Sequence, residues 1–314
     1  KVNPSKVAII GCGFVGSASA FALMQSGLFN EMVLLDANHD KAEGEARDIA
    51  HGLPFVRPMK LYAGGYDDIA DAAIIVITAG ANQKPDETRL DLVHKNVAIF
   101  ESIIPEITSR DYEGILLVVA NPVDILTYTA LKLSGYPENR VIGSGTVLDS
   151  ARLKYHLGEH LGVDSRSVHA FIVGEHGDSE IAAWSSANVS GIPLHDFCEM
   201  RGHHDHEGAT AEIAEKVKNS AYEIIQRKGA TYYGIAMSVK RICEAIIRDE
   251  RSILPISTMM DGEYGIKDVV LSMPSIVGAE GFISKVPISL SEDEIKALNK
   301  SAETLKSVLE EALE

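Results

Sequence analysis

The chain has 314 residues, of which 46% are hydrophobic and 24% are charged, a composition typical of a globular protein. Its formal net charge of −16 argues against nucleic acid as a partner, because phosphate binding needs a basic face. No apolar run is long enough to cross a bilayer, so a membrane partner is not expected either.

The first half of the chain alternates apolar strands with helical segments. Residues 6–11 form an apolar run without alternation, which predicts a strand buried on both faces. A helical pattern follows over residues 16–27, and residues 31–36 form a second strand that ends in an acid. Such alternation predicts a parallel, doubly wound sheet with right-handed crossovers. Further buried strands are predicted at residues 73–78, 114–120 and 140–143.

After about residue 145 the pattern changes, and we predict a second domain of the α+β type. Residues 168–173 predict a strand, and residues 253–260 and 268–274 predict strands of an antiparallel, half-exposed sheet. Helices are predicted at residues 150–161, 207–228 and 231–248. We therefore expect a first domain at residues 1–144 and a substrate-binding or catalytic domain at residues 145–314.

The last helix is predicted from an amphipathic pattern near the end of the chain. Ser291 and Glu294 form a capping-box pattern at its start. Its apolar stripe consists of Ile295, Leu298, Ala302, Leu305 and Leu309.

A glycine fingerprint links the first strand to the first helix. The run Gly11-Cys12-Gly13-Phe14-Val15-Gly16 has the G-x-G-x-x-G spacing that allows a tight turn and close approach of a pyrophosphate to the helix N-terminus. Asp36 follows twenty residues after the last glycine, at the end of the second strand. Its carboxylate suits a ribose diol and would repel a 2′-phosphate, so a Rossmann-type domain that prefers NAD over NADP is predicted.

A histidine between two glycines is the main candidate for acid–base chemistry. His176 lies in the run Gly174-Glu175-His176-Gly177-Asp178-Ser179. A proton-transferring imidazole needs a carboxylate partner, for which Asp149 and Asp178 are both candidates. Arg152 stands three residues after Asp149, on the same helix face, and its guanidinium suits a substrate carboxylate.

Several motifs together resemble the lactate/malate dehydrogenase family over nearly the whole chain, from about Lys6. They are GCGFVG, AGANQKPDETR, NPVD, GSGTVLDSAR, GEHGDSE and KGATYYG. The likeness is to the bacterial L-lactate branch of the family. It implies the reversible, NADH-dependent reduction of pyruvate to L-lactate, the last step of fermentative glycolysis.

The resemblance also implies a role for each site residue. His176 would be the proton donor and acceptor, Asp149 its carboxylate partner, and Arg152 the ligand of the substrate carboxylate. Arg89 would lie on a mobile loop, polarise the carbonyl and stabilise the charge that develops there. Asn121 would lie beside the substrate oxygen and the nicotinamide. The predicted NAD-binding residues are Gly11, Gly13, Phe14, Val15, Gly16, Asp36, Thr78, Ala79, Gly80 and Asn121.

Substrate choice depends mainly on Gln83. Malate dehydrogenases of this family resemble the loop but carry an arginine there, which pairs with the second carboxylate of oxaloacetate. Neutral glutamine fits a small uncharged group, and Thr231 also resembles the lactate type. The alternatives are a malate dehydrogenase, a related L-2-hydroxy acid dehydrogenase, and a non-catalytic NAD(H)-binding sensor.

The resemblance raises the questions of an effector and of assembly. Some bacterial members are activated by fructose 1,6-bisphosphate through an arginine and a histidine, positions that Lys154 and His169 occupy here. The family assembles as tetramers, so a homotetramer is expected. No metal site is predicted, since residues 203–206 fit a solvated loop better than a ligand cluster. The three cysteines are far apart and odd in number, which favours the cytoplasm over a disulfide framework.

Overall fold

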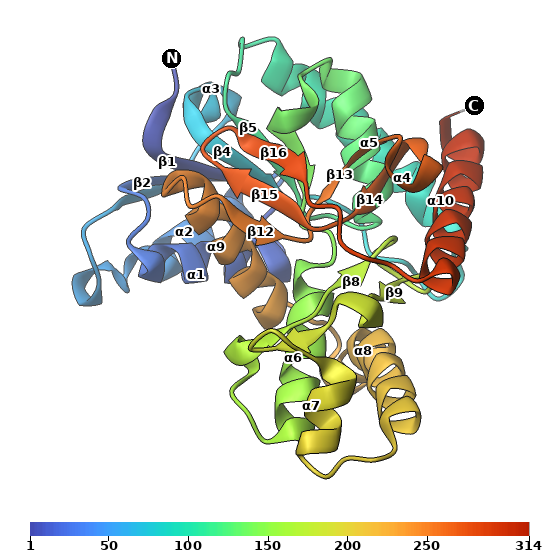
Figure 1. The fold of residues 1–314 in the computed structure, drawn as a ribbon. Coiled ribbons are helices and arrows are strands. Elements are labelled where there is room, and N and C mark those ends of the chain that lie inside the picture. Colours follow the sequence, from blue (N-terminus) through green and yellow to red (C-terminus); the bar gives the residue numbers. More distant parts are fainter. Residues whose placement is uncertain (314) are drawn as a thin grey trace.

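Strands and helices alternate in the first half of the chain, as the apolar runs predict (Figure 1). The computed structural model describes residues 1–313. The elements of this half are β1 (Asn3–Ile10), α1 (Phe14–Ser26), β2 (Glu31–Leu35), α2 (His39–Ala50), β3 (Lys60–Ala63), α3 (Tyr66–Ile69), β4 (Ala72–Ile77), α4 (Arg89–Thr108), β5 (Ile115–Val118), α5 (Val123–Ser134) and β6 (Val141–Gly143). Among the strands of this half, β3 alone was not predicted, because it is short and its residues are partly exposed.

The second half of the chain forms a separate lobe around α6, α7 and α8 and then returns to the sheet (Figure 1). Its elements are α6 (Val147–Leu161), β7 (Val168–His169), β8 (Ile172–Val173), β9 (Ile181–Ala182), β10 (Asn188–Val189), β11 (Ile192–Pro193), α7 (Leu194–Met200), α8 (His206–Lys228), α9 (Tyr233–Ile247), β12 (Ser252–Leu254), β13 (Ser257–Asp261), β14 (Lys267–Ser272), β15 (Ser275–Gly278), β16 (Gly281–Lys285) and α10 (Glu292–Leu313). Short 3-10 helices lie in the connections: η1 (Leu53–Phe55), η2 (Glu138–Arg140), η3 (Ser165–Ser167), η4 (Trp184–Ser186) and η5 (Glu263–Gly265).

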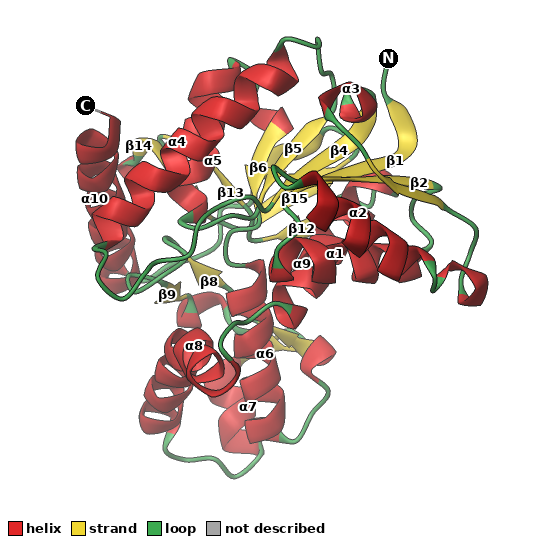
Figure 2. Ribbon diagram, turned by 180° about the vertical axis from the view of Figure 1, so that it is seen from behind, coloured by secondary structure: helices red, strands yellow, loops and turns green. Residues whose placement is uncertain are grey.

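One large sheet organises the molecule. Within residues 1–313 its strand order is β14-β13-β6-β5-β4-β1-β2-β3. The strands from β6 to β3 are parallel, as predicted, and β13 joins β6 antiparallel through Ser257 beside Gly143. Helices cover both faces of the sheet, with α1, α2 and α9 on one side and α4 and α5 on the other (Figure 2). The doubly wound α/β fold is confirmed.

The parallel strands form because alternate residues are buried on opposite faces. In β1, Val7 and Ile9 pack in the cluster that contains α1 and α9, whereas Ala8 and Ile10 pack in the cluster that contains α4 and α5. All four side chains are almost completely buried. Because β1, β2, β4 and β5 are parallel, their carboxyl ends lie together at one edge of the sheet. Ligands bind at this edge in such folds.

Two predicted strands are wrong in extent, because each is split in two. The run at residues 168–173 bends, so that β7 pairs with β10 and β8 pairs with β9 in a different sheet. The run at residues 253–260 is interrupted by Pro255, which has no N–H to donate and separates β12 from β13.

The half-exposed character predicted for residues 253–260 and 268–274 is also wrong for most of β13 and β14. Four residues of each strand are buried, because β13 and β14 extend the central sheet and are covered by neighbouring elements. The second half of the chain thus completes the sheet of the first half. A boundary near residue 145 stays a prediction.

Two helices outside the sheet, α6 and α10, are each stabilised by a feature that the sequence shows. In α6, Leu153, Leu157 and Leu161 recur on one face and are buried in the core of the second lobe. This anchorage fixes the first turn of α6, which contains Asp149. In α10, the capping box is confirmed: Glu294 N–H donates to Ser291 Oγ at 3.1 Å, and Ser291 N–H donates to Glu294 Oε1 at 2.9 Å.

Candidate active site

The carboxyl edge of the parallel sheet opens into a cavity of about 810 Å³. Of the predicted cofactor residues, those at the strand ends line it, namely Gly11, Gly13, Asp36, Thr78, Ala79 and Gly80. Of the other four, Phe14, Val15 and Gly16 form the first turn of α1, and Asn121 lines a second pocket. A long cavity lined by the ends of neighbouring parallel strands fits a dinucleotide.

Two of the fingerprint glycines, Gly11 and Gly16, are required by close backbone contacts. Gly11 has a positive φ of +102°, and a Cβ there would lie 2.6 Å from Ala79 N. A Cβ on Gly16 would lie 1.8 Å from Gly11 O, so α1 packs directly against the turn. At Gly13, by contrast, a Cβ would meet no atom within 4 Å, which leaves the N-terminus of α1 open to a phosphate. The residues present therefore fit the dinucleotide.

Asp36 is fixed at the edge of this cavity by backbone donors. Cys12 N–H donates to its Oδ2 at 2.7 Å, and Asn38 N–H donates to its Oδ1 at 2.9 Å. Each carboxylate oxygen keeps a further lone pair for a ribose hydroxyl. This geometry agrees with the preference for NAD expected from the sequence.

A second, smaller pocket of about 220 Å³ brings together residues from distant parts of the chain. Four predicted site residues line it, namely Gln83, Arg89, Asn121 and His176. Asp178, a candidate partner of His176, also lines it, together with four residues that had not been assigned to the site, namely Leu92, Pro122, Gly177 and Tyr222. The pocket therefore contains both an acid–base group and a guanidinium.

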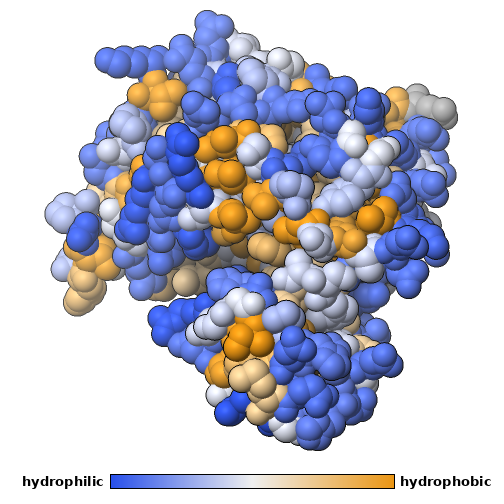
Figure 3. Space-filling view, viewed as in Figure 1, coloured by the Kyte–Doolittle hydropathy of each residue, from blue (hydrophilic) through white to orange (hydrophobic). Residues whose placement is uncertain are grey.

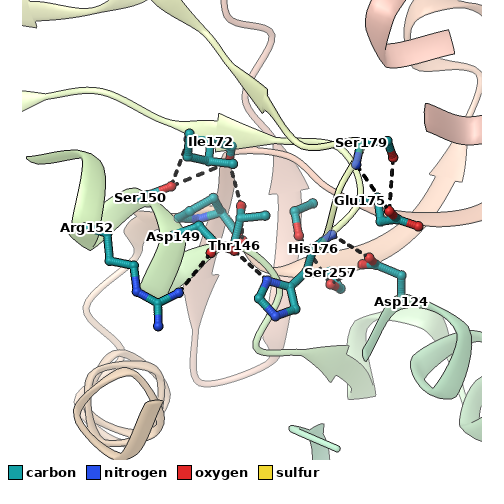
Figure 4. Close-up of polar contacts among 12 residues, drawn as sticks. Asp124, Thr146, Asp149, Ser150, Arg152, Ile172, Glu175, His176, Ser179 and Ser257 are labelled. Carbon is teal, nitrogen blue, oxygen red and sulfur yellow. Dashed lines mark hydrogen bonds and ion pairs between the residues drawn. The ribbon is translucent and has the colours of Figure 1, made fainter. Parts of the chain in front are cut away.

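Asp149 is the partner of the His176 ring. The two atoms His176 Nδ1 and Asp149 Oδ2 lie 2.5 Å apart, and the Asp149 side chain is only 4% exposed (Figure 4). The other candidate, Asp178, instead accepts a hydrogen bond from Tyr222 Oη at 3.1 Å. The structure thus decides between the two carboxylates.

This pairing raises the pKa of His176 to about 9, mainly through the negative charge of Asp149, against the opposing effect of burial. Burial raises the pKa of Asp149, but the charges of His176 and Arg152 outweigh it and hold that pKa below its usual value. Arg152 Nη1 donates to Asp149 Oδ1 at 3.3 Å (Figure 4). At neutral pH the His176 ring is therefore protonated.

The backbone of His176 is held by a residue that the sequence did not single out. His176 N–H donates to Asp124 Oδ2 at 2.8 Å, and Ser257 Oγ donates to Asp124 Oδ1 at 2.7 Å (Figure 4). Burial raises the pKa of Asp124 to about 6, although both hydrogen bonds lower it. Asp124 belongs to the NPVD motif, and this motif was the feature of the sequence that could have identified it.

The loop before α4 carries Gln83 and leads into Arg89. Gln83 Nε2 donates to Glu87 O at 2.9 Å, which orders the loop internally. Thr88 caps α4 and accepts from Asp91 N–H at 3.1 Å, so Arg89 is the first residue of the helix. Its side chain is 48% exposed and reaches Glu175 beside His176.

Other predicted residues line neither cavity, and Asp149 and Arg152 on α6 are among them. Thr231 stands between α8 and α9 and lines neither pocket. Lys154 is partly buried on α6, and His169 is exposed on β7, with no contact between them among the hydrogen bonds and ion pairs of residues 1–313. Glu180, not predicted, has its pKa raised to about 8 by burial and by the charge of Asp149.

Comparison with known proteins identifies the family. Residues 5–143 match the NAD binding domain of lactate/malate dehydrogenase, and residues 146–314 match its alpha/beta C-terminal domain. The chain belongs to the lactate/malate dehydrogenase family. Its first half is therefore an NAD-binding domain, as the glycine fingerprint and Asp36 predict.

Curated relatives and solved structures agree with this assignment. The chain is 54% identical over 304 residues to L-lactate dehydrogenase of Acetivibrio thermocellus, covering 97% of this chain and 96% of that protein. It is 52% identical over 306 residues to L-lactate dehydrogenase 1 of Clostridium acetobutylicum, covering 98% of both. The crystal structure of the ligand-bound minor L-lactate dehydrogenase from Enterococcus mundtii has a TM-score of 0.95 and 45% identity, covering 98% of this chain and 99% of that chain.

Replacing Asp149 with asparagine tests the electrostatic origin of the raised histidine pKa. In Asp149→Asn, the His176 pKa should fall from about 9 to the ordinary value of 6.5 or below, because the charge is lost while burial remains. NMR titration of the imidazole measures this directly. Asp178→Asn is the matched control, since Asp178 contacts Tyr222 and not the ring.

The same shift has a consequence for stability. A histidine whose folded pKa exceeds its unfolded value stabilises the fold fully below pH 6.5, and this contribution is lost as the pH rises through 9. The Asp149→Asn protein should lack that part of the pH dependence of unfolding. A His176 pKa that stays near 9 in this variant would contradict the assignment of Asp149.

Proposed function

We propose that His176, Asp149, Arg152 and Arg89 carry out the chemistry of an L-lactate dehydrogenase. The chain is an NAD-dependent oxidoreductase that interconverts pyruvate and L-lactate. The observation that carries the assignment of roles is the ion pair of His176 with the buried Asp149, beside a pocket that also contains a guanidinium. When bound, NADH supplies a hydride to the carbonyl carbon, and the side chains of the site do the rest.

Proton transfer is the task of His176. Because Nδ1 faces Asp149, the ring keeps its Nε2–H for the carbonyl oxygen. The proton moves to that oxygen as the carbon is reduced, and Asp149 stabilises the imidazolium before transfer. In the reverse direction the neutral ring accepts the proton of the lactate hydroxyl.

Two arginines hold and polarise the substrate. Arg152 is largely buried beside Asp149, and its guanidinium can bind the substrate carboxylate in a bidentate manner. Arg89 lines the pocket with His176 and stabilises negative charge on the carbonyl oxygen. Closure of the loop that contains Gln83 excludes water and strengthens these interactions. Asn121, at the pocket wall, lies beside the oxygen and the nicotinamide.

Substrate choice is proposed to depend on Gln83 and, secondarily, on Thr231. Gln83 lines the pocket and brings no positive charge to it. A dicarboxylate would lack a counter-charge at this position, at a cost in desolvation. A malate dehydrogenase, another L-2-hydroxy acid dehydrogenase and a non-catalytic sensor are not favoured by the relatives described above.

The cellular setting is proposed to be the last step of fermentative glycolysis in the cytoplasm. In the described part of the chain, Cys12, Cys198 and Cys243 are free and buried. No helix within residues 1–313 is both long enough and apolar enough to span a membrane. These observations are consistent with a reducing compartment.

A homotetramer is the proposed assembly. Large apolar side chains are exposed where α1 and α9 pack together, namely Phe21, Tyr233 and Met237. Hydrophobic residues also gather across the middle of the face in Figure 3, over β15 and β16. Exposed apolar patches of this kind are typical of surfaces between subunits.

The direct test of the function removes the acid–base group. His176→Ala should lower the kcat for pyruvate reduction at least about 100-fold, because the pocket loses its imidazolium proton donor. NADH affinity should stay nearly unchanged, since the backbone bond from residue 176 to Asp124 survives. His94→Ala, which removes an exposed histidine of α4, is the control. Steady-state NADH oxidation and NADH fluorescence titration measure the two quantities; lost NADH binding would instead make His176 structural.

The proposed specificity is tested by introducing the missing charge. Gln83→Arg should move the preference from pyruvate toward oxaloacetate, because the guanidinium pairs with the second carboxylate. The measured quantity is the ratio of kcat/KM for the two substrates. An unchanged ratio would disprove the role of Gln83. Lys84→Arg, at the neighbouring exposed position, controls for a general effect of the loop.

Activation by fructose 1,6-bisphosphate is proposed to use Lys154 and His169. Burial, followed by the nearby charge of Arg241, lowers the pKa of Lys154, so a bound phosphate would relieve an unfavourable site. A rate titration with the bisphosphate at low pyruvate should show activation, and Lys154→Ala should abolish it. Lys300→Ala, exposed on α10, is the control. A flat titration of the parent enzyme would exclude this activator.

A further inference from the structure

The loop that carries His176 contains a buried carboxylate of its own, Glu175, which the chemistry described above does not use. The Glu175 side chain is only 2% exposed, and its ion-pair partner is Arg89. Arg89 Nη2 donates to Glu175 Oε2 at 3.1 Å. A buried carboxylate is costly unless it is paired and hydrogen-bonded. Glu175 meets this condition through the arginine that faces the substrate pocket.

Two serine side chains also hold Glu175, one through its carboxylate and the other through its backbone N–H. Ser179 Oγ donates to Glu175 Oε1 at 3.1 Å (Figure 4). Glu175 N–H donates to Ser301 Oγ at 3.0 Å, and the two serine hydroxyls lie 2.9 Å apart. Ser301 is completely buried on α10. The carboxylate is therefore a rigid acceptor, attached to both its own loop and the last helix.

The arginine, by contrast, is held at one point only. Within residues 1–313, the hydrogen bond to Glu175 is the one that the Arg89 side chain makes. A guanidinium has five N–H donors, so the remaining donors stay available to a ligand. Arg89 and His176 line the same pocket of about 220 Å³. Glu175 can therefore keep its bond while Arg89 contacts a substrate.

We propose that Glu175 is a positioning residue that fixes the Arg89 guanidinium beside His176, so that both groups reach the same carbonyl oxygen. The inference rests on the role proposed above for Arg89. An exposed arginine without a fixed partner would lose side-chain conformational entropy on each turnover. Because Glu175 already orders Arg89, this entropic cost is smaller. Because Arg89 acts on charge that develops in the transition state, loss of the anchor lowers kcat more than it raises KM.

The test replaces the charge and keeps the shape. In Glu175→Gln, we expect kcat for pyruvate to fall about 10- to 100-fold through misplacement of the guanidinium. The KM should change less than about threefold. Glu250→Gln, which breaks the ion pair with Arg241 at 2.7 Å elsewhere in the chain, is the matched control and should leave kcat unchanged. A parent-like kcat in Glu175→Gln would overturn the proposal.

A double-mutant cycle separates positioning from a general structural role. Because Glu175 acts through the fork of Arg89, Glu175→Gln should cost less than about threefold in an Arg89→Lys background. Equal losses in both backgrounds would overturn the proposal. If Arg89→Lys alone left kcat unchanged, the role proposed for Arg89 would fail. If Arg89→Lys lowered kcat and Glu175→Gln did not, the role of Glu175 alone would fail.

A second variant covers the case in which the neutral side chain does not fold. Glu175→Asp keeps the charge, but its carboxylate is one methylene shorter and cannot reach both Ser179 and Arg89. We expect it to fold, with a thermal midpoint near that of the parent, and to lose at least about fivefold in kcat by displacement of the guanidinium. A folded Glu175→Asp protein with parent kcat would contradict the anchoring role.

Discussion

The ion pair between the partly buried His176 and the buried Asp149 is the interaction on which the rest of the site depends. The Asp149 side chain is only 4% exposed, so its charge needs partners, and His176 and Arg152 provide them. The two residues come from different elements, one from the loop after β8 and the other from the first turn of α6. The pair can form only when the lobe around α6 and the central sheet have both folded, which couples the chemistry to the whole architecture.

Three carboxylates lie in or beside the short loop of His176, and each has a different hydrogen-bond partner. Asp149 contacts the ring and sets its proton affinity. Asp124 accepts from the backbone N–H and ties the loop to α5 and, through Ser257, to β13. Glu175 turns away from the ring and pairs with Arg89. The chain has a strongly negative net charge, and some of its acidic groups lie in the site. There they orient the cationic side chains that are proposed to contact the substrate.

The sequence predicted the parts of the structure that depend on local patterns. Continuous apolar runs identified the central parallel strands, and glycine spacing with Asp36 identified the cofactor edge, because both signals lie within about 25 residues. Contacts across long separations left no such signal. Arg89 and Glu175 are 86 residues apart, and Asp124 and His176 are 52 apart, so their pairing follows only from the fold.

The errors in the strands have a similar cause. Pro255 marks one break in the sequence, but the bend between β7 and β8 depends on which strands are their partners. The burial of β13 and β14 could not be inferred from their own residues, because it follows from their addition to the edge of a sheet formed by the first half. Of the two residues expected to determine specificity, Gln83 lines the smaller pocket, whereas Thr231 lines neither cavity.

The pairing of β13 with β6 also determines how the molecule can be divided. A fragment that ended near residue 144 would keep the nucleotide cavity but would leave β6 as an open edge, with unpaired N–H and C=O groups beside apolar faces that β13, β14 and α9 normally cover. Such a fragment is prone to aggregate when it is produced alone. The two halves of the chain share one sheet and should therefore be expressed together.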